Sequence, residues 1–389
     1  MVKVLVVDDS SFVRRSLIAI LEKDPDIQVV GTANDGNEAI VKAAQLDPDI
    51  ITMDVEMPKM DGISALERIM AENPLPVIMV SAITKEGAAT TLRAMELGAL
   101  DYISKMGSDN TRDAQQVEKD LCSKIKALAR RKAFLRLKFK NAAARNALST
   151  GAGAARPTFS SSLHAPAAPM RPSAVSTPRS VLSQQPAWHN PHPGGGGPFE
   201  VIAIGVSTGG PPAVQTVLSS LPADFPVPIL IGQHMPAAFT GPFAQRLNSQ
   251  CAIAVKEAEP VERAKPGVVY ICPGGKHIRL EQRGASLMVV ITEEPKDALY
   301  KPTANVLMET VALASGRKAL GVTMTGMGYD GVEGTKILKQ KGGWAIAQNE
   351  ESCVVYGMPK AVVDAGLADE IVDLKDMAAT ILAHFNRKP

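Results

Sequence analysis

The sequence lacks the patterns that mark secreted, membrane-spanning and zinc-stabilised proteins. Its four cysteines are scattered and form no Cys-x-x-Cys pair, which favours a reduced compartment and gives no structural zinc motif. No apolar run reaches membrane-spanning length, and Asp8 and Asp9 interrupt the first apolar run before it could act as a signal peptide. We therefore expect a soluble, cytoplasmic protein without membrane insertion.

Acidic residues are absent from a long central segment, residues 121–199. Lysines and arginines cluster between Lys124 and Lys140, and the segment from Ala142 to Pro198 is rich in Ala, Ser, Pro and Gly. A segment with so few large apolar residues cannot form a core, so we predict a basic helix extension and a flexible linker over residues 124–198. Because the net charge is only +2 and no helix-turn-helix pattern follows the basic helix, we expect no nucleic acid partner.

The first 123 residues alternate short apolar runs with stretches that carry apolar residues at helical spacing. Expected strands lie at Lys3–Val7, Ile27–Thr32, Ile50–Met53, Val77–Val80 and Tyr102–Ile103. Five strand–helix repeats predict an α/β domain with a doubly wound parallel sheet. The working residues of such a sheet sit beyond the carboxyl ends of its strands.

Charged and polar residues lie at the carboxyl ends of four of these strands. Asp8 and Asp9 follow the first strand, Asp54 the third, Ser81 the fourth and Lys105 the fifth. Three carboxylates at one sheet edge form a hard oxygen site suited to Mg²⁺. A carboxylate beside the metal could attack phosphorus, while the lysine and the serine bind phosphoryl oxygens. Each residue taken singly could instead cap a helix, but five at one edge favour phosphoryl transfer.

These residues carry a resemblance to a known family. Asp8-Asp9, the segment Met53–Gly62, Ser81-Ala82 and Lys105 resemble the receiver domain of two-component response regulators, which has a flavodoxin-like fold. The resemblance implies that residues 1–123 are a receiver domain phosphorylated by a histidine kinase. One departure is Met106, which stands where receivers usually carry a proline after the lysine.

The resemblance also implies roles for single residues. Asp54 is the expected phospho-acceptor, and the expected ligands of Mg²⁺ are Asp8, Asp9, Asp54 and the backbone carbonyl of Glu56. Ser81 and Lys105 are expected to bind the phosphoryl group, with Tyr102 as an aromatic switch beside the lysine.

Residues 199–389 alternate again between apolar runs and helical patterns, which predicts a second doubly wound α/β domain. Expected parallel strands include Val201–Ile204, Ile229–Gly232, Ile253–Val255, Ala319–Thr323 and Trp344–Gln348. Closely spaced runs with turn signals predict an antiparallel excursion made of Val268–Ile271, His277–Leu280 and Leu287–Ile291.

A glycine-rich turn, residues 205–211, follows the first of these strands and precedes an expected helix that starts at Pro211. Such a turn lifts Ser207 above the carboxyl edge of the sheet and leaves N–H groups of the helix start nearby, where they could hold an oxyanion. The same kind of turn also cradles phosphates, or is only a turn. A nucleophilic serine therefore needs partners elsewhere in the chain.

The candidate base is His234, because it sits where an expected parallel strand ends, as Ser207 does. His277 lies in the expected antiparallel strands, and His384 is expected on the surface of the terminal helix. The other three histidines, His164, His189 and His192, fall in the linker and have no fixed geometry.

The candidate acid is Asp330, which follows the expected strand Ala319–Thr323. It could orient His234 and stabilise its imidazolium, although it could equally cap the helix that follows. A triad of this kind needs no cofactor to hydrolyse an ester. Its order along the chain differs from the Ser, Asp, His order of α/β-hydrolases, which disfavours an ordinary lipase.

Four motifs in this region resemble the chemotaxis protein-glutamate methylesterases, in which the esterase is fused behind a receiver; the motifs are Gly205–Pro211, Gln233–Pro236, Thr325–Gly331 and Tyr356–Pro359. The resemblance implies hydrolysis of glutamate γ-methyl esters on the cytoplasmic helices of methyl-accepting chemoreceptors, with release of methanol, and deamidation of receptor glutamines. It implies Ser207 as nucleophile, His234 as base and Asp330 as its orienter, with Thr208 and Met327 lining the site.

The order of the two domains motivates a hypothesis on regulation. The unphosphorylated receiver would pack over the esterase cleft, and phosphorylation of Asp54 by a chemotaxis histidine kinase would shift the equilibrium away from that packing. Two other functions stay open on the residues alone. One is a switched module that binds a phosphate or nucleotide at the Gly205–Pro211 turn, and the other is a DNA-binding regulator, which the α/β output domain disfavours.

Overall fold

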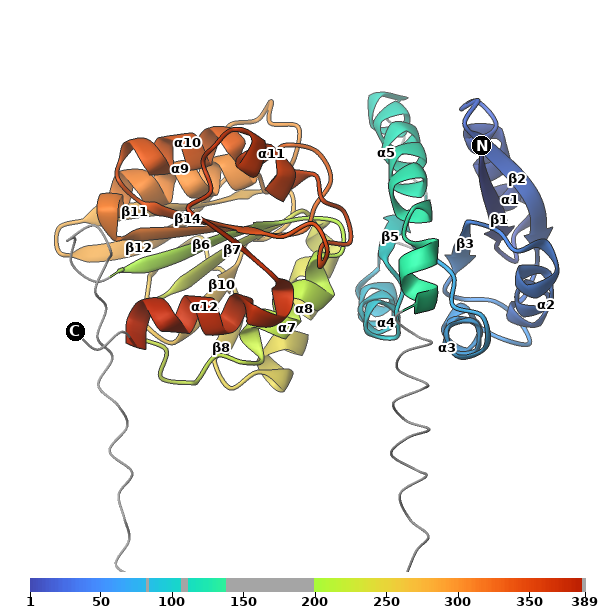
Figure 1. The fold of residues 1–389 in the computed structure, drawn as a ribbon, viewed down its shortest axis with the longest axis horizontal. Coiled ribbons are helices and arrows are strands. Elements are labelled where there is room, and N and C mark those ends of the chain that lie inside the picture. The colour runs from blue at the N-terminus through green and yellow to red at the C-terminus, as the bar shows by residue number, and fades with distance from the viewer. Residues whose placement is uncertain (82–83, 106–110, 138–198, 387–389) are drawn as a thin grey trace, which may run out of the picture.

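The computed structural model describes residues 1–81, 84–105, 111–137 and 199–386 and contains two α/β domains (Figure 1). Met106 and most of the expected linker, with its three histidines, lie outside the described residues. Within the described part of the chain, no helix is long and apolar enough to cross a membrane.

Five parallel strands form the sheet of the first domain, in the order β2-β1-β3-β4-β5. Their bounds are β1 Val2–Val7, β2 Ile27–Ala33, β3 Ile50–Asp54, β4 Val77–Ser81 and β5 Asp101–Ser104, each end within one residue of the prediction. Every residue of β3 and β4 is buried, as expected for parallel strands with helices on both faces.

The helices of this domain begin where side chains can cap them. Their bounds are α1 Ser11–Leu21, α2 Gly36–Leu46, α3 Gly62–Glu72, α4 Lys85–Glu96 and α5 Thr111–Ala129. The side chains that accept N–H groups of the first turns of α1 to α4 are Ser10, Asp35, Asp61 and Thr84. These N–H groups have no partner within the helix, so the capping residues fix the helix starts.

Helix α5 continues beyond residue 123 to Ala129, and a further helical stretch covers residues 132–137. Lys132 and Arg136 of this stretch form ion pairs with Asp47, and Leu135 is buried. The described part of the basic extension therefore folds back on the first domain, where its charges face a carboxylate.

Seven parallel strands form the main sheet of the second domain, in the order β15-β14-β13-β6-β7-β10-β8. Their bounds are β6 Val201–Val206, β7 Ile229–Gln233, β8 Ala254–Glu257, β10 Val268–Ile271, β13 Ala319–Thr323, β14 Trp344–Gln348 and β15 Glu370–Val372. Strand β6 lies between β13 and β7, so the chain segments that follow these three strands meet at one edge.

The helices of the second domain cover both faces of this sheet, with α9, α10 and α11 on one face and α7, α8 and α12 on the other (Figure 1). Their bounds are α7 Gly210–Leu218, α8 Ala237–Gln250, α9 Ala304–Ser315, α10 Val332–Gln340, α11 Met358–Asp364 and α12 Leu374–Asn386. Pro211 stands in the first turn of α7, close to where the sequence predicts the helix to start.

The predicted antiparallel excursion is partly wrong. Val268–Ile271 is β10, which pairs parallel with β7 and β8 inside the main sheet. The antiparallel sheet consists of β11 (His277–Arg283), β12 (Ser286–Thr292) and a strand that sequence reasoning missed, β9 (Val261–Arg263). Turn signals locate strand ends, but partners far along the chain decide whether a strand pairs parallel or antiparallel.

Candidate active site and phosphorylation site

The strand order of the second domain brings the three predicted triad residues together. Ser207 follows β6, His234 follows β7, and Asp330 lies in the segment after β13. Val206 is in register with Gln233 of β7, and Gly205 is in register with Thr323 of β13. Parallel strands in this register end at the same level, so their following segments converge on one edge.

The side chains of Ser207, His234 and Asp330 form a continuous chain of contacts. Nδ1 of His234 lies 3.1 Å from Oγ of Ser207, and Nε2 lies 2.7 Å from Oδ2 of Asp330. A carboxylate can only accept, so Nε2 carries the proton and Nδ1 is left to accept from the serine hydroxyl. The two ring nitrogens thus have the opposite roles from those in a chymotrypsin-type triad.

Asp330 also forms hydrogen bonds with groups other than His234. Its carboxylate accepts hydrogen bonds from the Thr303 hydroxyl and from the backbone N–H groups of Ala304 and Asn305. Burial by itself raises the pKa of Asp330, but the contacts with His234, Thr303 and Ala304 outweigh it and place that pKa below its usual value. The carboxylate therefore stays ionised beside the imidazole.

The alternative that Asp330 caps the following helix is wrong. The N-cap of α10 is Gly331, whereas the N–H groups that Asp330 accepts belong to the first turn of α9. A carboxylate at a helix N-terminus is favoured by the helix dipole. Thr303 is the N-cap of α9. Sequence reasoning missed this role, although a threonine just before an expected helix is a signal for an N-cap.

The turn after β6 packs closely against Val354. Gly209 has a φ of 75°, and an added Cβ there would meet Val354 at 2.4 Å, so only glycine fits. The N–H of Gly210 donates to the carbonyl of Ser207 itself. This first N–H of α7 is therefore not free for a substrate, in contrast to the prediction that the helix start holds the oxyanion.

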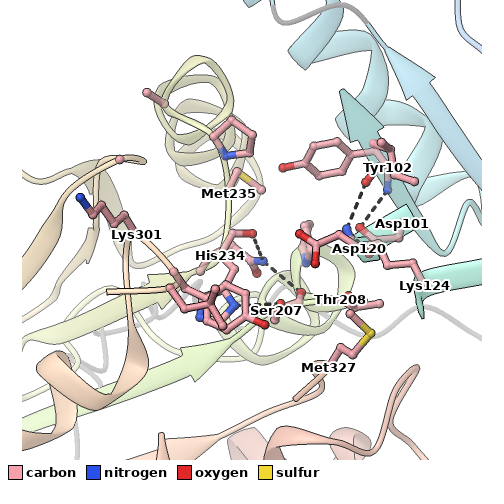
Figure 2. Close-up of a pocket in the computed structure, with 18 residues that line it drawn as sticks. Asp101, Tyr102, Asp120, Lys124, Ser207, Thr208, His234, Met235, Lys301 and Met327 are labelled. Atoms are coloured by element: carbon pink, nitrogen blue, oxygen red, sulfur yellow. Dashed lines mark hydrogen bonds and ion pairs between the residues drawn. The ribbon is translucent and has the colours of Figure 1, made fainter. Parts of the chain in front are cut away.

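A cavity of about 700 Å³ opens in front of Ser207 and His234. Thr208 and Met327, the two predicted lining residues, both line it. The Thr208 hydroxyl is buried and has no hydrogen-bond partner among the described residues. Figure 2 shows Met327 and Thr208 on the same side of the cavity as Ser207.

The first domain closes the other side of this cavity. Tyr102, Asp120 and Lys124 line it from β5 and α5, and Figure 2 shows them across from His234 and Met235. Lys124 pairs with Asp101 at 2.8 Å. A group that approached Ser207 would have to enter a space that the first domain partly fills.

Side chains of both domains are in direct contact beside the cavity. The ring of Tyr102 stacks on that of Phe239 in α8, with centroids 4.6 Å apart and planes 12° apart. Helix α4 packs on α8, and Glu96 of α4 forms a two-pronged ion pair and hydrogen bond with Arg246. Tyr102, the predicted aromatic switch, is thus buried against the second domain.

Of the two histidines outside the triad and the linker, one was predicted incorrectly. His384 is only 3% exposed, and its Nε2 lies 2.7 Å from Oε1 of Glu370. The surface prediction failed because strand β15, which sequence reasoning missed, brings Glu370 beside α12. His277 is buried between β11 and the segment that leads into α9.

The predicted phosphorylation residues also meet at one sheet edge. Oxygen atoms of Asp8, Asp9 and Asp54 lie within 4.8 Å of one another, with Asp8 and Asp54 almost fully buried and Asp9 exposed. The ammonium of Lys105 lies 2.6 Å from Oδ2 of Asp54 and 3.1 Å from Oδ2 of Asp8.

Burial dominates the electrostatics of Asp54. It raises the pKa of this carboxyl to about 6, and the nearby charge of Asp8 adds to the effect, while contacts with Lys105 and the Glu56 N–H oppose it. Burial lowers the pKa of Lys105, but its two carboxylate partners outweigh this and raise it. A divalent cation would relieve the repulsion between the carboxylates, so this set of hard oxygen donors fits Mg²⁺.

Two other predicted residues lie at the same edge. Ser81 ends β4, and its hydroxyl lies 3.5 Å from the carbonyl of Gly87. Glu56 contacts Asp54 through its backbone N–H. The Glu56 carbonyl as a metal ligand stays a prediction.

Comparison with known proteins identifies the family of the whole chain. A CheB methylesterase family model matches residues 202–381, and a response regulator receiver domain model matches residues 4–114. A protein of Oleidesulfovibrio alaskensis named protein-glutamate methylesterase/protein-glutamine glutaminase 1 is 53% identical over 386 residues, which cover 98% of this chain and 99% of that protein. The chain belongs to this methylesterase/glutaminase family.

A second relative is similar over nearly its whole length. The protein-glutamate methylesterase/protein-glutamine glutaminase 2 of Nitratidesulfovibrio vulgaris is 55% identical over 392 residues, covering 98% of this chain and 99% of that protein. The family is one of hydrolases that carry a response regulator receiver domain.

Two solved structures each match one domain. The Thermotoga maritima CheB methylesterase catalytic domain is 37% identical, covers 47% of this chain and 97% of that chain, and has a TM-score of 0.46. The response regulator domain of Thermotoga maritima CheB is 49% identical, covers 32% of this chain and 94% of that chain, and has a TM-score of 0.30.

Proposed function

We propose that this protein hydrolyses glutamate γ-methyl esters on the cytoplasmic helices of methyl-accepting chemoreceptors, deamidates receptor glutamines, and is activated by phosphorylation of Asp54. The observation that carries the hydrolytic part is the contact chain from Ser207 through His234 to Asp330 at the floor of a cavity. Family membership points to the substrate class.

The reaction would proceed through an acyl-enzyme. Oγ of Ser207 attacks the ester carbonyl while Nδ1 of His234 takes its proton, and Asp330 stabilises the imidazolium through Nε2–H. The histidine then returns the proton to the leaving methoxide, which departs as methanol. Water attacks the acyl-enzyme in the second half, with the same histidine as base, and releases glutamate. With glutamine as substrate the leaving group is ammonia.

The oxyanion of this reaction needs hydrogen-bond donors close to Ser207. The N–H of Gly210 is already used by the Ser207 carbonyl. The N–H groups of Thr208 and Gly209 have no acceptor among the described residues, and the buried Thr208 hydroxyl has no partner there either. We assign the oxyanion site to these donors.

The receiver would act by covering this cavity. Tyr102, Asp120 and Lys124 lie across the cavity from Ser207, and the Tyr102 ring is stacked on α8, which begins three residues after His234. Phosphorylation of Asp54 would weaken this packing and open the cavity to a receptor helix. The phosphodonor is a chemotaxis histidine kinase.

In the phosphorylation step the Asp54 carboxylate would attack phosphorus, and Lys105 and Ser81 would bind the phosphoryl oxygens. Asp8, Asp9 and Asp54 would hold Mg²⁺, which neutralises charge on the transferring group when bound. The esterase step would need no cofactor.

The test of this function is methanol release from methylated receptor membranes by the purified full chain, with and without Mg²⁺ and acetyl phosphate. Release that rises with the phosphodonor supports both parts of the proposal. Absence of release under either condition would contradict the hydrolytic part. Methanol release at the same rate with and without the phosphodonor would contradict the regulatory part alone.

The substitution Asp54→Asn is expected to abolish this stimulation, so that the ratio of stimulated to unstimulated rate falls to about one. An amide cannot form an acyl phosphate, and the packing of the receiver on the cavity would persist. Acetyl phosphate and Mg²⁺ are added to both proteins and methanol is measured. Asp26→Asn, at an exposed turn, is the matched control and should keep full stimulation; stimulation that survives Asp54→Asn would place the acceptor elsewhere.

The substitution Arg246→Ala is expected to raise the unstimulated rate up to about fivefold. The Glu96–Arg246 pair joins α4 to α8 and is about 30% exposed, and pairs of this exposure contribute about 0.2–1 kcal/mol. The substitution removes this energy from the covered state only. The fraction of molecules with an open cavity therefore increases up to about fivefold, and the unstimulated rate increases with it. The contact with Arg246 holds the pKa of Glu96 below its usual value, although burial acts in the opposite direction.

The control for this prediction is Arg68→Ala, which removes a similar exposed pair with Glu72 inside the first domain. It should leave the unstimulated rate unchanged. Equal unstimulated rates for Arg246→Ala and the wild type would show that the α4–α8 contact does not hold the cavity closed.

A further inference from the structure

The imidazole of His234 is covered on one face by an aromatic ring outside the triad. Tyr300 stacks on it with ring centroids 4.3 Å apart and planes 13° apart. Tyr300 also lines the cavity in front of Ser207. Burial raises the pKa of its phenol, and the charge of Asp120 adds to this, so the ring is neutral over the working range of a hydrolase.

The segment that carries Tyr300 also holds the acid of the triad. It connects β12 to α9 and comprises residues 293–303. Its last residue, Thr303, donates its hydroxyl hydrogen to Asp330, and the next N–H, that of Ala304, does the same. One short segment therefore contacts both the histidine and the aspartate.

His277 fixes the position of this segment. The N–H of Thr303 donates to Nδ1 of His277 at 3.3 Å, and Nε2 of the same ring lies 3.2 Å from the carbonyl of Pro295. Nδ1 accepts, so Nε2 carries the proton that it donates to Pro295. Burial lowers the pKa of His277, which keeps it in this neutral form. The N–H of Gly275 also donates to the Lys301 carbonyl.

The Tyr300 ring restrains a tilt of the His234 imidazole that the hydrogen bonds of His234 resist only weakly. The contacts to Ser207 and Asp330 lie in the ring plane, so they resist tilting about the line joining the two nitrogens only weakly. A flat ring packed parallel against the imidazole restrains that tilt by steric contact. An aromatic face also stabilises the imidazolium that forms when the serine loses its proton.

We propose that Tyr300 is a positioning residue for His234, and that its flat ring rather than its hydroxyl does this work. The proposal rests on the proposed function, because it assumes that His234 is the base. A misplaced base lowers the rate of the chemical step, and a displacement of about 1 Å can cost about 100-fold. Binding of the receptor helix does not depend on the tilt of the imidazole.

The test compares Tyr300→Leu with Tyr300→Phe in the full chain, stimulated with acetyl phosphate and Mg²⁺. Methanol release gives kcat and KM on methylated receptor membranes. Tyr300→Leu should lower kcat by about tenfold to about 100-fold with KM changed by less than about twofold. Tyr300→Phe should keep kcat within about threefold of the wild type. Leu313→Ala is the control, because it removes a large apolar side chain that is 59% exposed on the same domain, and it should keep kcat.

Thermal melting of each variant separates positioning from folding. If Tyr300→Leu fails to fold, Tyr300→Met offers a flexible side chain without a flat face for the same comparison. Full kcat in a folded Leu or Met variant overturns the proposal, as does a loss confined to KM or a Phe variant as slow as Leu. Ser207→Ala is run alongside: if it stays active, the proposed function fails, whereas an inactive Ser207→Ala with a fully active Tyr300→Leu refutes only the role of Tyr300.

Discussion

Replacing Ser207 with alanine is expected to lower methanol release from methylated receptor membranes by at least about 10⁴-fold. The hydroxyl is the nucleophile in the proposed mechanism, and no other hydroxyl or thiol of the described residues forms a hydrogen bond with the His234 ring. The Cβ of the residue is kept, so the turn after β6 should keep its shape. The remaining rate would come from the oxyanion donors and from substrate binding.

The control for this loss is Ser220→Ala, which changes the same residue type at an exposed position after α7. It should leave the rate and the melting temperature unchanged. A Ser207→Ala protein that folds as the wild type does and still releases methanol at more than a hundredth of its rate, roughly, would exclude an acyl-enzyme at Ser207.

Replacing Asp330 with asparagine is expected to lower the rate by about 10⁴-fold. The carboxylate accepts from Nε2 of His234 and from the N–H of Ala304 through the same oxygen, Oδ2. An asparagine that keeps its oxygen on Thr303 turns its NH₂ group toward these two donors. His234 would then move its proton to Nδ1, which could no longer accept from Ser207.

The alternative orientation of the asparagine also leaves one hydrogen-bond donor facing another. With its oxygen toward His234 and Ala304, its NH₂ group would face the N–H of Asn305, which donates to Oδ1. One donor–donor contact arises in either orientation, so some loss of stability should accompany the loss of rate. The measurement is single-turnover methanol release over a range of pH, with the melting temperature recorded for each protein.

Asp364→Asn serves as the control, because Asp364 is exposed and pairs only with Lys360 among the contacts of the described chain. It should behave as the wild type in both measurements. An Asp330→Asn protein with a rate within about tenfold of the wild type would mean that Asp330 only accepts N–H groups of the first turn of α9.

The sequence alone predicted the local units of both domains. Short apolar runs followed by helical patterns located the strands of the first sheet to within one residue at each end. Residues that directly follow such strands, among them Asp54, Ser207 and His234, could be selected as site residues. They could be selected because strand ends are local signals, and because parallel sheets collect their working residues at one edge.

Local patterns could not predict contacts between segments distant in the chain. The sequence placed Val268–Ile271 in an antiparallel excursion and His384 on the surface, and both predictions were wrong. In each case the missing information was a partner: β7 and β8 for the strand, and Glu370 of β15 for the histidine.

The tertiary structure decided the working geometry of the site. The motifs named Ser207, His234 and Asp330, but the strand order β13-β6-β7 sets their distances. Nothing in the residues around Tyr300 or His277 indicates a role, because each acts through a contact with a distant segment. The chain alone thus determined which residues stand at strand ends. Which of these ends become neighbours, and which side chains support them, depends on long-range packing that no local pattern records.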